Sequence, residues 1–339
     1  MRVLGTTGSH ALEAVHEVHV VSLPMRVPFR GVLHREAVLL GGPGGWGEFA
    51  PFPEYGDDES ALWLAAALES VAGDWPEPVR TEVPVNATVP AVTAAEVAGV
   101  LSRFAGCTTA KVKVAQAGQS LADDVARVAA VREVLGPQGR VRVDANGAWS
   151  LDDAVRAVTA LAAFSLEYVE QPCASVEDLG RLRVLLAHGG VDALVAADES
   201  VRRADDPLRV ARAGAADLLV LKVAPLGGVR PALRIAEECG LPVVVSSALD
   251  TSVGISAGIA LAAALPELPY ACGLATTNLM TGDVVEAGLL DSGPGRMRAG
   301  AVVPEPELLA RYAASADRQQ WWRDRLARCT AVLAADSST

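Results

Sequence analysis

Short apolar runs alternate with longer amphipathic segments along most of the chain from Val83 onward. The runs are rich in valine and leucine, as buried parallel strands are, and the segments between them have helical periodicity. There are eight runs, at residues 83–89, 109–115, 140–146, 166–172, 194–200, 217–224, 241–248 and 270–276. This rhythm predicts an α/β barrel of eight strands.

The segments between the runs carry helix-start signals. Those at 120–136 and 150–164 open with a serine followed by acidic residues, which a helix N-terminus favours. A doubly wound open sheet is the alternative fold. It is disfavoured because no G-x-G-x-x-G follows the first run and the rhythm persists through eight strands.

The two ends of the chain follow a different pattern. Residues 1–82 contain β-rich runs, a Gly/Pro-rich loop and one apolar helical stretch, which together predict a small α+β domain. We therefore expect this N-terminal unit at 1–82, a barrel at 83–303, and a C-terminal segment, 304–339, that packs back on the N-terminal unit.

Composition narrows the function classes. The net charge of −12 and the sequence pI near 4.9 argue against nucleic acid and anionic membranes as partners, since both need a basic surface. The most apolar run, 253–265, is much shorter than the ~20 residues of a membrane span. The five cysteines lack metal-ligand spacing, and no signal-peptide pattern is present, so we expect a cytoplasmic protein.

Charged residues interrupt the apolar runs near their carboxyl ends, where barrel enzymes carry their chemistry. Five successive runs supply such residues: Lys111 and Lys113, Asp144 with Asn146, Glu170, Asp198 with Glu199, and Lys222. Side chains alternate along a strand, so the two lysines of the second run share one face. Because the apolar face of a barrel strand packs on the helices, this lysine face is predicted to point into the barrel mouth.

Three of these residues, Asp144, Glu170 and Asp198, are carboxylates on adjacent strands. Left unpaired, they would repel one another, and a hard divalent cation resolves the conflict. An all-oxygen ligand set without His or Cys favours Mg²⁺, with Mn²⁺ as a substitute, and disfavours zinc. A metal flanked by lysines suits a small carboxylate substrate that loses the adjacent proton to a neutral lysine.

The motifs TAKVKV, DANGAW, EQP, ADES and LKVAPLGG, in this order, resemble the muconate-lactonizing subgroup of the enolase superfamily. Within it, RVPFRG, GWGEFAPFPEY and SSALDTSVG resemble the actinobacterial o-succinylbenzoate synthases. The resemblance implies a modified TIM barrel of (β/α)7β type under an α+β capping domain that the C-terminal segment completes. It also implies a Mg²⁺-dependent syn dehydration of 2-succinyl-6-hydroxy-2,4-cyclohexadiene-1-carboxylate in menaquinone biosynthesis.

The same resemblance assigns roles to residues. Lys113 matches the base that removes the α-proton and later protonates the departing hydroxyl. Lys111 would tune that base, and Lys222 would stabilise the enediolate from the opposite face. The metal ligands match Asp144, Glu170 and Asp198, with Asn146 and Glu199 behind them, and Ser247 and Gly273 match backbone positions that hold the succinyl carboxylate.

Two loops of the capping domain are expected to close the barrel mouth. Phe29 and Arg30 lie in one, and Phe49, Phe52 and Tyr55 in the other. Arg30 either meets a substrate carboxylate or is solvated, and the aromatic residues either line the mouth or pack the cap on the barrel.

Other functions remain possible from the sequence alone. N-succinylamino acid racemases keep the same lysines, whereas dipeptide epimerases usually carry an Asp-x-Asp where this chain reads GLATTN. Muconate-type cycloisomerisation ranks lower, and mandelate-racemase chemistry would want a His in the seventh run, which reads SSALD. A non-catalytic barrel would not be expected to keep three carboxylates and three lysines.

Overall fold

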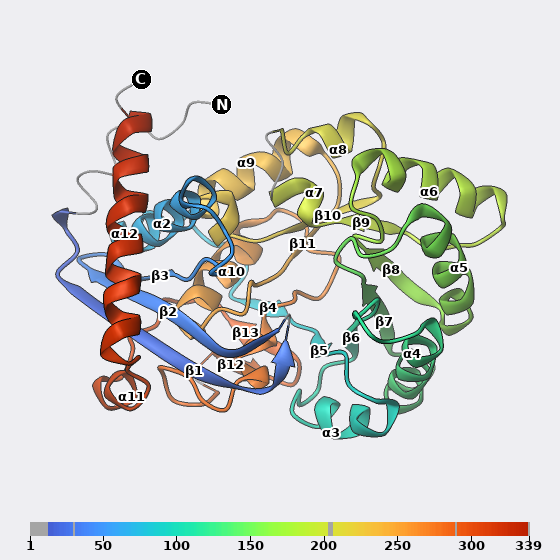
Figure 1. Ribbon diagram of the computed structural model, residues 1–339, viewed down its shortest axis with the longest axis horizontal. Coiled ribbons are helices and arrows are strands. Elements are labelled where there is room, and N and C mark those ends of the chain that lie inside the picture. Colours follow the sequence, from blue (N-terminus) through green and yellow to red (C-terminus); the bar gives the residue numbers. More distant parts are fainter. Residues whose placement is uncertain (1–12, 30, 203–205, 289, 338–339) are drawn as a thin grey trace.

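The computed structural model describes residues 13–29, 31–202, 206–288 and 290–337. Its first unit is an antiparallel sheet of β1 (Glu17–Phe29), β2 (Val32–Gly42) and β3 (Gly45–Phe49), with helix α2 (Asp57–Ala72) behind it. Three acidic residues occupy the first turn of α2, and Gly73 ends it in the left-handed conformation that glycine adopts most readily. Figure 1 shows this unit beside the barrel.

The end of the chain returns to this unit, as the sequence pattern predicts. Helix α11 (Pro306–Arg311) leads into α12 (Ala316–Ser337), which crosses the blue sheet in Figure 1. The Trp322 indole donates to Glu36 Oε2 over 2.8 Å, and its ring meets Phe49 edge-on at 5.9 Å. The domain limits at residues 82 and 303 stay predictions.

The second unit is a parallel sheet whose seven strands follow one another in chain order. They are β5 (Ala87–Val89), β6 (Thr109–Lys113), β7 (Arg140–Asp144), β8 (Leu166–Glu170), β9 (Val195–Ala197), β10 (Leu218–Leu221) and β11 (Val243–Val245). The connecting helices are α3 (Val97–Leu101), α4 (Leu121–Leu135), α5 (Leu151–Leu161), α6 (Val176–His188), α7 (Glu199–Arg202), α8 (Arg209–Arg212), α9 (Val229–Cys239) and α10 (Ser252–Ala264). As predicted, Ser120 and Ser150 cap α4 and α5.

The sheet closes on itself through a short segment after α10. Cys272 bridges Val85 beside β5, and Gly273 bridges Ser246 beside β11. The predicted barrel of (β/α)7β type is therefore confirmed, and the open-sheet alternative is wrong, because an open doubly wound sheet reverses its strand order and leaves two edges.

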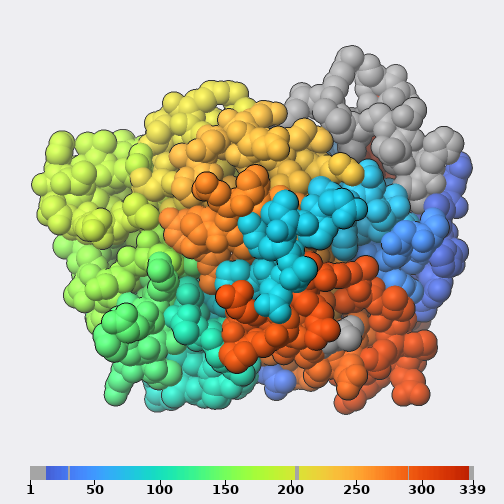
Figure 2. Space-filling view, turned by 180° about the vertical axis from the view of Figure 1, so that it is seen from behind, coloured from blue at the N-terminus to red at the C-terminus, as the bar shows by residue number. Residues whose placement is uncertain are grey.

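The predicted strands at 194–200 and 217–224 are shorter than expected, because α7 begins at Glu199 and a 3₁₀ turn begins at Ala224. Two others, the first and the last, differ in their pairing. The first is divided between two sheets, because β4 (Glu82–Pro84) pairs antiparallel with β13 (Arg296–Arg298) and only β5 joins the barrel. In the rear view the cyan segment leading into β5 lies beside the orange-red segment that follows α10 (Figure 2). The last run forms only the two bridges before a 3₁₀ turn at Ala275–Leu279. No helix in the described part of the chain has the length and apolarity needed to cross a bilayer.

Two glutamates of the capping unit, the buried Glu48 and the partly buried Glu36, predict opposite pH responses. Burial and the charge of Asp250 raise the pKa of Glu48 from 4.5 to about 8. Burial also acts to raise the pKa of Glu36, but hydrogen bonds from Arg318 and Trp322 outweigh it and hold that pKa below 4.5.

Between pH 5 and 8 the folded chain keeps a proton on Glu48 that the unfolded chain has released, so the contribution of Glu48 to stability falls as pH rises. We therefore expect the difference in unfolding free energy between Glu48→Gln and the parent chain to shift in favour of the variant as the pH rises from 5 to 8. Glu36→Gln should instead lose a constant amount, because the ionised Glu36 contributes fully above its unfolded pKa. Urea unfolding at several pH values measures both differences, and parallel curves for the two variants would contradict the prediction.

Candidate active site

The charged residues predicted from the sequence meet at the carboxyl end of the barrel. Lys113, Asp144 and Glu170 are the last residues of β6, β7 and β8, and they are paired in register across these strands. Asp198 directly follows β9, and Lys222 directly follows β10. Parallel strands in register thus place five charged side chains at one level of the mouth.

Each carboxylate faces a lysine. Lys111 Nζ lies 3.0 Å from both carboxylate oxygens of Glu170, and Lys222 Nζ donates to Asp198 Oδ2 over 2.6 Å. Lys113 Nζ donates to Asp144 Oδ2. The carboxylates are at most 1% exposed, so these contacts neutralise charges that have almost no access to water.

These three are the only lysines in the sequence. The chain therefore places every ammonium side chain it has in this one site.

The electrostatic environment shifts the pKa values of the site residues in different directions. Burial and the charge of Asp144 raise the pKa of Glu170 to about 7. Burial lowers the pKa of Lys113, and the neighbouring Lys111 lowers it further against the opposing effect of Asp144. For Lys111, burial is outweighed by Glu170 and Asp144, which raise its pKa. Of the two lysines on β6, Lys113 is thus the one that gives up a proton more readily.

Asn146 and Glu199 lie next to the lysine–carboxylate pairs. Asn146 Oδ1 accepts from Lys113 Nζ over 2.6 Å, and its amide nitrogen donates to Glu199 Oε1 over 3.1 Å. The backbone of Asn146 is left-handed, with φ of 48°, and its N–H donates to Asp144 Oδ1. This turn orients the amide toward the amine of Lys113.

The sequence reasoning missed two residues that hold Asp198. Arg202 Nε donates to Asp198 Oδ1 over 3.0 Å, and Arg202 also donates to Glu199 Oε1 over 2.7 Å. The side chain of Gln171, which follows Glu170, accepts the N–H of Asp198 over 2.9 Å. The spacing of four residues between Asp198 and Arg202, which brings side chains together on one helical turn, could have indicated the role of Arg202.

A third missed residue is Thr88 on β5, which lines the pocket with the lysines. It pairs in register with Lys111, so both side chains point into the barrel. Its buried hydroxyl has no hydrogen-bond partner among the described residues.

The capping unit contributes one wall of the pocket. Phe29 and Phe52 line it, and Lys113 Nζ lies 5.3 Å from the centre of the Phe29 ring. Phe49 instead packs on Trp322 within the cap, and Tyr55 packs against Phe52 and Trp63. Arg30 lies outside the described residues.

The opposite wall follows β11. Ser246, Ser247, Ala248 and Leu249 line the pocket there, and Ser247 Oγ lies 2.6 Å from Thr276 Oγ1. The Gly273 N–H donates to Val245 and its carbonyl accepts the N–H of Ser247, so both groups serve ring closure. The predicted substrate roles of Ser247 and Gly273 stay predictions.

The donor set fits a divalent cation chemically. Asp144, Glu170 and Asp198 are three buried carboxylates on neighbouring strands, and the charges of Asp144 and Asp198 each raise the pKa of Glu170. In the described part of the chain no three His, Cys, Asp or Glu side chains already surround one point, because the lysines engage these carboxylates. The set can therefore supply oxygen ligands where a cation replaces the lysine contacts.

Comparison with known proteins places the chain in a family. The enolase C-terminal domain-like model matches residues 93–305, and the enolase N-terminal domain-like model matches residues 20–71. The o-succinylbenzoate synthase of Mycolicibacterium smegmatis (strain ATCC 700084 / mc(2)155) is 56% identical over 97% of this chain and 100% of its own length. This chain belongs to the o-succinylbenzoate synthase family. The o-succinylbenzoate synthase of Thermobifida fusca (strain YX) is 62% identical over 79% of this chain and 83% of its own length.

Solved structures agree on the fold of this o-succinylbenzoate synthase family member. A muconate lactonizing enzyme from Pseudomonas putida matches with a TM-score of 0.71 at 21% identity, over 88% of this chain and 98% of its own. The L-Ala-D/L-Glu epimerase from Bacillus subtilis matches equally well, with a TM-score of 0.71 at 24% identity, over 85% of this chain and 96% of its own. Proteins named for different reactions share the barrel, so the fold does not identify the reaction.

Replacing Arg202 tests whether it supports the site. Arg202→Met would remove one buried cationic partner from Asp198 and Glu199, which keep their contacts with Lys222 and Asn146, and removal of one partner from a buried ion pair typically costs about 3 kcal/mol. Arg212→Met is the matched control, because Arg212 pairs with Asp206 at the surface, where such pairs contribute about 1 kcal/mol or less. Urea unfolding of the metal-free proteins compares them, and equal losses would show that Arg202 is not a support of this kind.

Proposed function

We propose that this chain is an o-succinylbenzoate synthase, a hydro-lyase that converts 2-succinyl-6-hydroxy-2,4-cyclohexadiene-1-carboxylate to o-succinylbenzoate by syn dehydration in menaquinone biosynthesis. The observation that carries the proposal is the set of three buried carboxylate–lysine pairs in a member of this family. The racemase and epimerase alternatives are not favoured, since the curated relatives at 51–62% identity carry the synthase name.

Lys113 is the proposed base. The enzymes of this superfamily generally use a divalent metal, and we propose Mg²⁺ or Mn²⁺ on Asp144, Glu170 and Asp198. That cation would supply positive charge at the substrate carboxylate, which makes the adjacent proton more acidic. Burial and Lys111 both lower the pKa of Lys113, which favours the neutral amine that removes this proton.

Lys222 is proposed to stabilise the enediolate. It follows β10, whereas Lys113 ends β6, so the two amines approach from different sides of the mouth. The ammonium of Lys222 is held by Asp198, and a fixed positive charge in a dry site stabilises negative charge that develops in the reaction. The protonated Lys113 then returns its proton to the departing hydroxyl on the same face, and water leaves.

Asn146 positions the base. Its side-chain oxygen accepts from Lys113 Nζ, which limits the rotation of a long and otherwise flexible side chain. The Phe29 ring of the cap lies 5.3 Å from the same amine and limits its contact with water, since the Lys113 side chain is only 13% exposed. We propose that Ser247 contacts the succinyl part of the substrate from the opposite wall.

The proposed activity predicts metal dependence. We expect o-succinylbenzoate formation, followed by ultraviolet absorbance, to stop in EDTA and to return with Mg²⁺ or Mn²⁺. Asp144→Asn, Glu170→Gln and Asp198→Asn should each weaken Mn²⁺ binding, measured by calorimetry, together with the rate. Glu177→Gln is the control, since Glu177 lies at the surface on α6. Full turnover after exhaustive chelation would exclude the metal.

The two lysines are predicted to differ in proton exchange. Lys113→Ala should lose the proton transfer, an effect of about 10²–10⁴-fold or more in kcat. Lys222→Ala should lower kcat more than it raises KM, because its charge acts on the transition state. With a substrate analogue that cannot eliminate, deuterium from D₂O should enter in Lys222→Ala and not in Lys113→Ala, as NMR would report. Exchange in Lys113→Ala alone would reverse the assignment of the base.

A further inference from the structure

The pocket wall that follows β11 is attached to the capping unit by one buried arginine. Arg35 on β2 is 2% exposed, and its Nε donates to the carbonyl of Leu249 over 3.0 Å. A terminal nitrogen donates to the carbonyls of Ala248, over 3.2 Å, and Ala50. One guanidinium therefore joins a cap strand to two consecutive residues of the barrel wall.

The same arginine contacts the other wall. Its guanidinium carbon lies 4.6 Å from the centre of the Phe52 ring, and Phe52 lines the pocket from the cap. Arg35 thus lies behind the pocket and contacts both the cap residue and the barrel residues that face the substrate.

The pocket segment that Arg35 contacts contains a strained backbone conformation. Leu249 adopts a left-handed conformation, with φ of 64°, which is unfavourable for a branched apolar residue. The carbonyls of Ala248 and Leu249, which Arg35 engages, belong to the two peptide groups on either side of the Leu249 Cα atom. Loss of these bonds would free the turn to relax toward an ordinary conformation.

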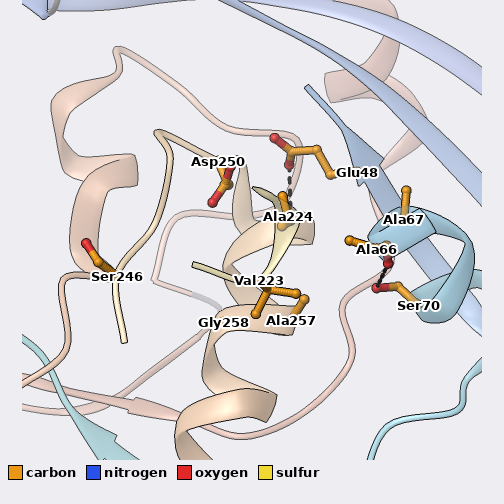
Figure 3. A pocket seen from close by; sticks show the side chains of 11 residues that line it. Glu48, Ala66, Ala67, Ser70, Val223, Ala224, Ser246, Asp250, Ala257 and Gly258 are labelled. Carbon is orange, nitrogen blue, oxygen red and sulfur yellow. Dashed lines mark hydrogen bonds between the residues drawn. The ribbon is translucent and has the colours of Figure 1, made fainter. Parts of the chain in front are cut away.

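A second cap residue holds the next part of the same segment. Glu48 on β3 accepts from the N–H of Thr251 and of Gly254, each over 3.0 Å, and from the Thr251 hydroxyl over 2.6 Å. It thereby caps the start of α10. Figure 3 shows the Glu48 side chain pointing from its strand toward the segment that carries Asp250, with Ser246 farther from Glu48 on the same side of the barrel.

We propose that Arg35 and Glu48 are positioning residues that set the shape of the substrate pocket by holding segment 246–251 against the capping unit. The segment carries Ser247, Ala248 and Leu249 into the pocket beside Lys222. The amines and carboxylates themselves lie on β6 to β10 and do not depend on this attachment. Its loss should therefore weaken substrate binding and leave the chemical step nearly intact. This inference rests on the proposed function for its kinetic readout.

Arg35→Lys is the test, since it keeps the charge and loses the fork that reaches several carbonyls. Arg80→Lys is the matched control. Arg80 also donates to three backbone carbonyls, those of Ala262, Leu265 and Pro266, but at the far end of α10. We expect a KM at least about tenfold higher in Arg35→Lys, with kcat within about threefold of the parent, and both constants unchanged in Arg80→Lys.

Glu48→Gln is the second variant, because it keeps the shape of the side chain and decides the question if Arg35→Lys does not fold. When the variant and the parent are assayed above pH 8, where Glu48 is ionised, the amide group must face at least one of the donors that Glu48 satisfies, so we expect KM to rise by about threefold with kcat unchanged. An unchanged KM in the folded variants would overturn the proposal, as would a fall in kcat without a rise in KM.

Hydrogen exchange measured by mass spectrometry separates this inference from the proposed function. Amides of residues 247–251 should exchange faster in Arg35→Lys and at the parent rate in Arg80→Lys, whatever reaction the chain catalyses. Equal exchange in the two variants would overturn the positioning role. An inactive parent chain with the expected exchange difference would overturn the proposed function alone.

Discussion

The mutual neutralisation of buried carboxylates and lysines is the constraint on which the barrel mouth depends. Asp144, Glu170 and Asp198 have essentially no contact with solvent, and an unpaired charge in such a place would be costly. Each is tolerated because an ammonium group lies within hydrogen-bonding distance. That requirement fixes β6 to β10 at one level, since a register shift of one residue would turn a charged side chain into the helical layer.

The capping unit makes this arrangement effective by keeping water out. Phe29 and Phe52 cover the mouth, and charges interact more strongly where water is excluded. The end of the chain contributes to the cover, because Arg325 on α12 donates to the carbonyls of Phe52 and Tyr55 over 3.0 and 2.7 Å. Residues more than 250 positions apart thus hold one loop. The barrel and its cover act as a single catalytic unit.

The sequence pattern predicts what depends on neighbours along the chain. Strand alternation and the positions of the polar residues were enough to bring Lys111, Lys113 and Asp144 into one mouth. The pairing of β4 with β13 was beyond reach, because it joins Val83 to Met297 and leaves no local periodicity. Arg35 was also missed, since in the run HREAVLL it resembles any polar residue of a half-buried strand. Its role depends on carbonyls more than 200 positions away.

The confinement of all three lysines to the mouth has a chemical consequence for the whole molecule. Every other side chain of the Lys/Arg class is an arginine, which does not react with amine-directed acylating reagents or aldehydes under mild conditions. Apart from the α-amino group, the folded chain therefore offers such reagents only buried amines, of which Lys113 is the most exposed at 13%. Acylation of a lysine amine in this protein, whether by a reagent or by a metabolic thioester, therefore cannot occur at a surface position away from the active site. Each acylation of a lysine removes a basic or charged amine from the active site, so acylation and inactivation coincide.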